Sequence, residues 1–284
     1  MKLIAVFVGL LASATAQPES ITAYNYHEAV GITEATRIQQ AEAALDFDGS
    51  RIVGGSISRL GANPHLGGMV VTLLDRRTSV CGSCLLTNTK AVTAAHCWTD
   101  GRAQAVLFTL VHGSLRLFSG GVRTSTSNVV MHPNWNPSNG YSDIAVVTFF
   151  RVNFNNNIQP ITLASGNNNY VGTWALASGY GAIAQGESVS RATVQREVSL
   201  RVISNAECRQ TFSFISDSVL CVDTQGGRAS TCGGDSGGPL DIGNGNSRAL
   251  IGITSFGHND GCQRGHPAAF TRVTSFNAWI RSHL

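Results

Sequence analysis

Short apolar runs, separated by residues that favour turns, fill the chain from about residue 66 to its end. The runs are rich in Val, Ile, Thr and Phe, and Gly, Asn, Ser or Pro interrupts each of them after a few residues. Clear examples span residues 69–74, 105–111, 144–149, 171–177, 249–254 and 268–273. β-Branched and aromatic runs broken by frequent turn signals are typical of antiparallel sheets. The pattern therefore predicts an all-β fold.

Two segments depart from this β pattern. Residues 275–283 place Phe276, Trp279 and Ile280 at helical spacing, which predicts one C-terminal helix that packs its apolar face on the body of the protein. Binding of this face to a membrane is the less favoured alternative. The polar stretch 153–160 is rich in Asn and predicts a connection between two halves.

The first 51 residues differ in composition from the rest of the chain. Residues 1–16 join a basic Lys2 to an apolar run at 3–11 and end in Ala-Thr-Ala, which is typical of a secretion signal. The run is too short to cross a bilayer. Residues 17–51 are acidic and contain no cysteine. A secreted, soluble protein is expected.

Three motifs hold the candidate chemistry. Residues 231–239 read TCGGDSGGP and place Ser236 in a glycine-rich turn, where backbone N–H groups of Gly234 and Ser236 can hold an oxyanion. A serine hydroxyl needs a base to become a nucleophile. His96 lies in TAAHC and Asp143 in YSDIAV, so the chain order is His, Asp, Ser.

With these motifs in this order, the chain resembles the trypsin/chymotrypsin family of serine peptidases from residue 52 to its end. The resemblance implies two antiparallel six-stranded β-barrels, in residues 52–164 and 165–284, with a C-terminal helix. It implies that His96 and Asp143 come from the first barrel and Ser236 from the second. His96 would be the general base, Asp143 its orienting carboxylate and Ser236 the nucleophile. A non-catalytic homologue that only binds is the alternative class, although all three residues are present.

The resemblance also implies an activation site. Arg51 precedes Ile52-Val-Gly-Gly, so cleavage after Arg51 would free the amine of Ile52 to pair with Asp235. Residues 17–51 would then be an activation propeptide, and an ordinary flexible linker is the alternative. Because the enzyme is not expected to cut after arginine, a separate trypsin-like activator is predicted.

Seven cysteines all lie after Arg51, and a secreted chain favours disulfides. The resemblance implies the pairs Cys81–Cys97, Cys208–Cys221 and Cys232–Cys262. Cys84 is left over and is expected to be a buried apolar residue. An intermolecular bridge and metal binding are the lesser alternatives.

The family pattern also implies which residues form the pocket for the side chain before the cut bond (P1). They are Ser230, Thr231, Gly233, Ser255, Phe256, Gly257 and Ala268. Ser230 stands where trypsins have an aspartate, so selection of basic side chains is disfavoured. With Gly257 leaving the mouth open, a large apolar P1 residue (Phe, Tyr or Leu) is expected. The methyl group of Ala268 favours leucine, and an elastase-like or broad preference is the alternative.

Charge changes the picture in one respect. The formal net charge is +3, and Lys90 is the only lysine after Lys2. Arginine keeps its charge far above the pKa of lysine, which suggests work in an alkaline lumen. The chain is similar to midgut chymotrypsins of plant-eating insects. A digestive, monomeric enzyme is expected, with protein substrates and protein inhibitors as partners. No cofactor, metal ion, nucleic acid or membrane partner is expected. Residues 103–122 contain no acid for the family's calcium loop.

Overall fold

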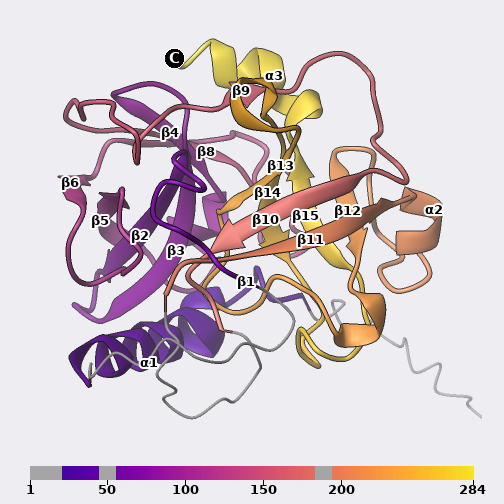
Figure 1. Ribbon diagram of the computed structural model, residues 1–284. Coiled ribbons are helices and arrows are strands. Elements are labelled where there is room, and N and C mark those ends of the chain that lie inside the picture. The colour runs from indigo at the N-terminus through magenta and orange to yellow at the C-terminus, as the bar shows by residue number, and fades with distance from the viewer. Residues whose placement is uncertain (1–20, 45–55, 183–193) are drawn as a thin grey trace, which may run out of the picture.

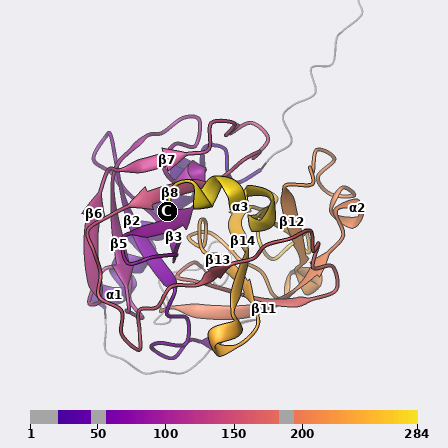
Figure 2. The same cartoon turned by 90° about the horizontal axis from the view of Figure 1, so that it is seen from above.

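The structure, a computed structural model, describes residues 21–44, 56–182 and 194–284 (Figure 1). The expected signal at 1–16 and the Arg51–Ile52 junction lie outside these residues. Two sheets lie side by side, and the view from above places the C-terminal helix over their junction (Figure 2). The fold is all-β with a C-terminal helix, as the sequence predicts.

The first sheet has the strand order β6-β5-β2-β3-β4-β8-β7, with antiparallel neighbours. Its strands are β2 (Leu66–Leu73), β3 (Thr78–Leu85), β4 (Lys90–Thr93), β5 (Ala105–His112), β6 (Val122–Thr126), β7 (Val129–Met131) and β8 (Ala145–Thr148). Met69, Val71 and Leu73 alternate along β2 and are buried. This period of two is the reason why the segment forms a strand with one face in the core.

The second sheet closes on itself, because β11 pairs with β12 in addition to the order β1-β11-β10-β13-β14-β15-β12. Its strands are β1 (Ser56–Ile57), β9 (Thr162–Leu163), β10 (Trp174–Gly179), β11 (Arg196–Ile203), β12 (Val219–Asp223), β13 (Pro239–Ile242), β14 (Ala249–Phe256) and β15 (Ala268–Arg272). β1 and β9 come from residues expected in the first barrel, yet both pair with this second sheet.

The C-terminal helix α3 (Val273–Arg281) has the apolar face expected from the sequence. Phe276 and Ile280 are buried, and Trp279 packs on the same core cluster. The Asn277 amide donates to the carbonyl of Ala164 at 2.6 Å. This hydrogen bond joins the helix to the residue that directly follows β9. The short helix α2 (Asn205–Cys208) begins at Ser204, whose side chain caps it.

A second long helix precedes the sheets, in the segment where the sequence suggested either a propeptide or a flexible linker. One helical turn (η1, His27–Gly31) leads into α1 (Ile32–Ala43). Ala35, Ile38 and Ala41 are buried at spacings of three residues. Ala35 and Ile38 pack in one cluster with Leu66, Val80, Val111, Leu117 and Tyr180. In Figure 1, α1 lies along one edge of the first sheet.

Candidate active site

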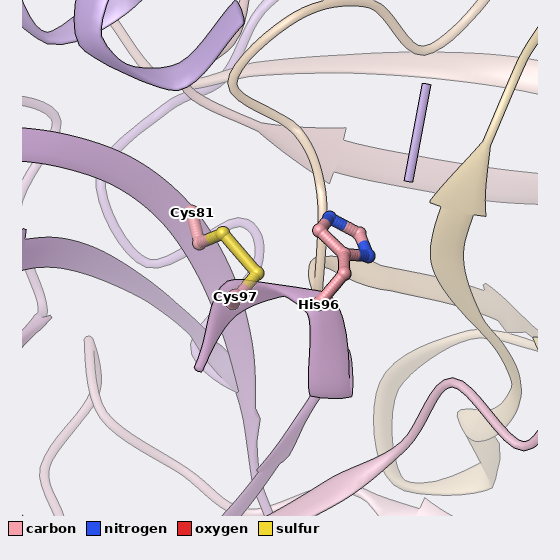
Figure 3. Close-up of side chains that lie close together, drawn as sticks. All are labelled: Cys81, His96 and Cys97. Carbon is pink, nitrogen blue, oxygen red and sulfur yellow. A yellow bond between two sulfur atoms is a disulfide. The ribbon is translucent and has the colours of Figure 1, made fainter. Parts of the chain in front are cut away.

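His96 lies in a helical turn (η2, Ala95–Cys97) directly after β4. The neighbouring Cys97 is joined to Cys81 of β3 by a disulfide, with a Cα–Cα distance of 6.3 Å (Figure 3). The histidine is completely buried. The covalent link holds the turn against the sheet, so the imidazole position is set by the first half of the molecule.

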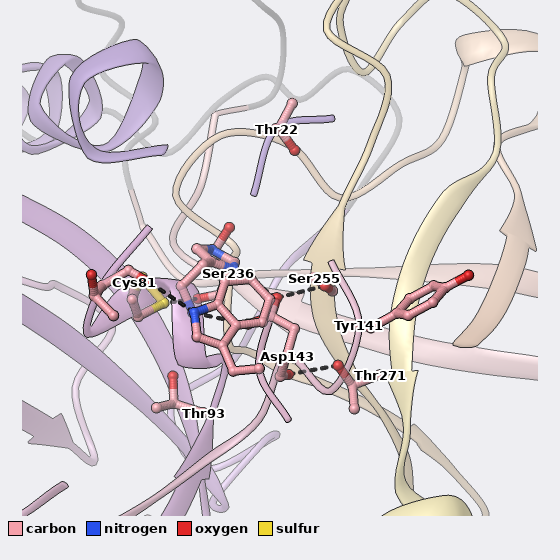
Figure 4. A network of polar contacts seen from close by, with 12 residues as sticks. Thr22, Cys81, Thr93, Tyr141, Asp143, Ser236, Ser255 and Thr271 are labelled. Atoms are coloured by element: carbon pink, nitrogen blue, oxygen red, sulfur yellow. Dashed lines mark hydrogen bonds and ion pairs between the residues drawn. A yellow bond between two sulfur atoms is a disulfide. The ribbon is translucent and has the colours of Figure 1, made fainter. Parts of the chain in front are cut away.

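Asp143 is the buried partner of His96. Its carboxylate accepts hydrogen bonds from Nδ1 of His96 at 2.7 Å, from the His96 backbone N–H at 2.9 Å and from the Ser255 hydroxyl at 2.6 Å. The Thr271 hydroxyl donates to the backbone carbonyl of Asp143 at 2.6 Å (Figure 4). With Nδ1–H directed at the carboxylate, Nε2 keeps its lone pair and can act as a base.

Ser236 lies in the glycine-rich turn that precedes β13, and it faces the first sheet. Gly237 has φ +81°, and a Cβ there would be 2.2 Å from the Thr93 hydroxyl and 2.4 Å from the carbonyl of Gly82. No larger residue fits that contact. The Gly82 N–H donates to the carbonyl of Ser236 at 2.6 Å. The turn is therefore docked on β3, which brings Ser236 and His96 into one site.

Asp235 is half-buried next to this serine. Its carboxylate accepts the N–H groups of Gly181 and Cys232 at 2.8 and 2.9 Å. Burial raises the pKa of Asp235 to about 6. A small cavity of about 60 Å³ borders the carboxylate and is also lined by Gly179 and Arg196. Ile52 lies outside the described residues, so its pairing with Asp235 stays a prediction.

A cavity of about 810 Å³ opens beside Ser236. All seven residues that the sequence assigns to the pocket line it: Ser230, Thr231, Gly233, Ser255, Phe256, Gly257 and Ala268. The Ser230 hydroxyl donates to the carbonyl of Thr231 at 2.8 Å. Among the described residues that line the cavity, Glu34 is the only carboxylate, and it belongs to the N-terminal segment.

The other cysteines agree with the expected pairing. Cys208 is bonded to Cys221, and Cys232 to Cys262. Cys84 is free and buried, and burial raises the pKa of its thiol well above the usual range. A thiol that resists ionisation is a poor nucleophile and a poor metal ligand.

Three further residues lie close together, although their spacing in the sequence matches no metal-ligand pattern. His258 and His266 stack with ring centroids 4.2 Å apart, and Asp260 lies 3.3 and 3.6 Å from their nitrogens. Both histidines line the cavity, whereas Asp260 is 63% exposed. The acid is therefore a charge at the pocket rim and not at its floor.

Tyr26 is the residue at this site that sequence reasoning missed. It directly precedes η1 and is buried. Its ring packs edge-on against the His96 imidazole, with the ring centroids 4.7 Å apart. Nε2 of His96 has no hydrogen-bond partner among the described residues. Tyr26 is one of two tyrosines in an acidic segment, and no motif marks it for the catalytic centre.

A buried His–Asp pair, a serine in a glycine-rich turn and an adjoining cavity, all between two β-sheets, define a serine peptidase of chymotrypsin-like fold. Comparison with known proteins agrees: the Trypsin family model matches residues 52–280. The chain belongs to the trypsin family and is a serine endopeptidase.

Individual proteins are also similar to this chain over most of its length. A collagenase of Hypoderma lineatum is 33% identical over 90% of this chain and 95% of its own length. An alkaline trypsin C of Manduca sexta is 34% identical over 86% of this chain and 94% of its own. A solved structure of a protein named HL collagenase covers 82% of this chain and 98% of its own, at 34% identity, with a TM-score of 0.74.

Within the residues that the structure describes, no helix is long and apolar enough to cross a membrane.

Proposed function

We propose that the protein is a secreted digestive zymogen, and that cleavage after Arg51 yields an endopeptidase which cuts after large apolar residues. The observation that carries the proposal is the cavity beside Ser236, which is open at Gly257 and has Ser230 in place of an acid. The steps below give the role of each residue.

The chemistry follows from the hydrogen bonds around His96. Ser236 attacks the substrate carbonyl while Nε2 of His96 takes its proton, and the imidazolium that forms is stabilised by Asp143. The N–H groups of Gly234 and Ser236 bind the oxyanion, where a donor contributes roughly 3–4 kcal/mol in comparable sites. His96 then gives the proton to the leaving amine. Water enters, and the same residues hydrolyse the acyl-enzyme.

The specificity follows from the charge and size of the cavity. A P1 arginine would bury its guanidinium without a carboxylate partner once the segment bearing Glu34 has left, and such burial is costly. An added Cβ at Gly257 meets no atom within 4 Å, so the mouth admits a large side chain. These two features support Phe, Tyr or Leu at P1.

The place of β1 supports the activation step. β1 begins at Ser56 and pairs with Arg196 and Glu197, which both line the cavity beside Asp235. Ile52 stands four positions before Ser56, and an extended chain of four residue steps reaches about 13 Å. A new ammonium at Ile52 could therefore enter this cavity and offset the cost of the buried carboxylate.

A broader specificity is the second candidate. Ala268 is 4% exposed and lines the cavity, so its methyl group takes up space that a large aromatic ring would need. Relatives of the chain include proteins named collagenase and brachyurin as well as trypsin. This candidate predicts that leucine and smaller apolar residues are cut as well as phenylalanine.

The place of action is the gut lumen in this proposal. The three disulfides suit an oxidising compartment, and the scarcity of lysine suits an alkaline one. Activation there requires a trypsin-like partner, because the pocket of the enzyme does not accept Arg51.

The test is an assay of the clipped protein. The full chain is cleaved with immobilised trypsin, the trypsin is removed, and peptides with Phe, Leu, Ala or Arg at P1 are assayed. Turnover of Phe or Leu that is absent in Ser236→Ala supports the proposal. A preference for Ala moves the enzyme to the elastase class, and turnover of Arg contradicts the pocket assignment. No turnover of any of the four peptides, at high dilution as well, favours a non-catalytic homologue.

A further inference from the structure

The described N-terminal segment runs through the cleft that should hold a substrate. Ile21 forms a β-bridge with His258, and the Thr22 N–H donates to the carbonyl of Gly257 at 3.2 Å. The Gly257 N–H in turn donates to the Thr22 hydroxyl at 3.0 Å. Figure 4 shows Thr22 beside the catalytic network. The segment thus takes the sheet edge where an extended substrate backbone would pair.

The Tyr26 side chain then fills the catalytic centre. Its hydroxyl donates to the carbonyl of Val80 at 2.8 Å, and it lies near enough to the Ser236 hydroxyl and the backbone N–H of Gly234 for both to act on its pKa. The phenol oxygen therefore lies beside both the nucleophile and a donor proposed for the oxyanion. The ring shields Nε2 of His96, which would otherwise receive the proton of Ser236.

The path of the backbone keeps a peptide carbonyl away from that donor. Asn25 has φ +56°, a left-handed conformation that asparagine tolerates better than most residues. The turn is held by Asp100, whose carbonyl accepts the Asn25 N–H at 3.1 Å and whose carboxylate accepts the His27 N–H at 2.8 Å. Because a side-chain oxygen faces the Gly234 N–H, no bond of the segment is presented for attack there.

The helix that follows anchors the segment on both sides of the site. Val30 lies so close to Gly233 that a Cβ on the glycine would be 2.8 Å from its Cγ1. At the far end, the Glu42 carboxylate accepts the N–H groups of Leu117 and Phe118 at 2.6 and 3.0 Å and the Ser119 hydroxyl at 2.9 Å. Between these ends lies the buried face of α1.

We propose that residues 21–43 are an active-site inhibitor of this peptidase, which stays bound after the Arg51–Ile52 bond is cut. Dissociation of the segment, and not the cut alone, then frees the catalytic centre. All seven cysteines follow Arg51, so no disulfide can tether the cut segment. Its release therefore depends on concentration. The inference rests on the proposed cleavage after Arg51.

The experiment compares clipped full-length variants over a wide dilution. Trypsin should spare Arg37, which is 8% exposed and paired with Glu34 at 2.7 Å. After clipping, turnover per molecule of the wild type should rise at least roughly tenfold over a roughly thousandfold dilution, as the segment dissociates. Tyr26→Ala, which removes the buried ring from the catalytic centre, should release the segment and reach full activity at a much higher concentration than the wild type. Gln39→Ala, an exposed site on α1, is the matched control and should behave as wild type.

Two further measurements keep the inference separate from the proposed function. Gel filtration with mass spectrometry reports whether the cut segment stays with the body, independently of activity. Glu42→Gln, which weakens only the distant anchor, should shift the dilution curve to higher concentration. A wild type that is fully active at every dilution, or a segment that elutes alone at the highest concentration, overturns the inhibitor while leaving the peptidase in place. A retained segment with silence in every variant, Tyr26→Ala included, contradicts the proposed function and the inhibitor with it.

Discussion

Ser255 connects the pocket to the proposed catalytic histidine, because its hydroxyl donates to the same Asp143 oxygen that accepts Nδ1 of His96. A hydrogen bond to a charged group is worth roughly 1.5–3 kcal/mol. Ser255→Ala should therefore lower kcat on the order of tenfold to a hundredfold and leave KM nearly unchanged, since the substrate contacts the backbone of this strand. Steady-state kinetics check this, with the exposed Ser199→Ala as control. A change in KM alone would show that the hydroxyl serves binding.

Gly257 tests the size of the pocket mouth. Its position has room for a Cβ, so Gly257→Val should fold and narrow the entrance. We expect kcat/KM for a Phe substrate to fall roughly tenfold to a hundredfold relative to an Ala substrate, the range that pocket contacts supply. The ratio of the two specificity constants is the measurement. An unchanged ratio would mean that P1 does not enter past this residue.

At the residue scale, the sequence best predicts those positions at which the reaction requires one particular residue type. Ser236, His96 and Asp143 could be proposed as the catalytic residues because the glycine-rich turn and the histidine motif are specific. Tyr26 could not be, because its role depends on the left-handed turn at Asn25 and on a burial that no local pattern records.

At the scale of elements, β3 and the serine turn are in direct contact. A Cβ on Gly82 would be 2.9 Å from the backbone of Gly238, so Gly82→Ala must push the turn away from the strand. We expect a loss of about 1–3 kcal/mol in the free energy of unfolding, together with a lower kcat. Thermal unfolding is the check, and Gly257→Ala is the stability control because its added Cβ meets open space. Equal melting temperatures would show that the turn adapts without cost.

The elements also show where sequence patterns lose information. α3 was predictable because three large apolar residues stand at helical spacing. α1 was not, because its buried residues are Ala35, Arg37, Ile38 and Ala41, and two alanines and an arginine give little contrast with the polar face. Likewise, the pairing of β1 and β9 with the second sheet follows from tertiary packing and not from either two-residue sequence.

At the scale of the whole molecule, buried histidines set the acid limit of stability. Burial lowers the pKa of His112 to about 4, and neither ring nitrogen has a hydrogen-bond partner among the described residues. A depressed pKa means that the stability is complete above about pH 6.5 and falls as the pH drops towards 4, by about 3 kcal/mol in all. His112→Phe should remove this part of the slope. Denaturant unfolding between pH 7 and 4 tests it, and identical slopes would contradict it.

An alkaline medium should act on the N-terminal segment in the opposite sense. Burial raises the pKa of Tyr26, and the nearby carboxylates of Glu34 and Asp235 raise it further; His96 and His27 also face the ring. The contribution of Tyr26 to docking is complete below about pH 10, the value of a free phenol, and is lost as pH rises above it. The dissociation constant of the cut segment should rise about tenfold per pH unit there. Tyr26→Phe should abolish the dependence, and a parallel rise in both proteins would contradict it.

The central claim is that Ser236 is a nucleophile which becomes available only after the chain is cut and the segment leaves. A fluorophosphonate probe, followed by mass spectrometry of the peptides, tests this directly. We predict an adduct on Ser236 in the clipped, diluted protein and almost none in the intact chain. Equal labelling of Ser236 before and after cleavage would contradict the latent site, and no labelling in either form would contradict the nucleophile itself.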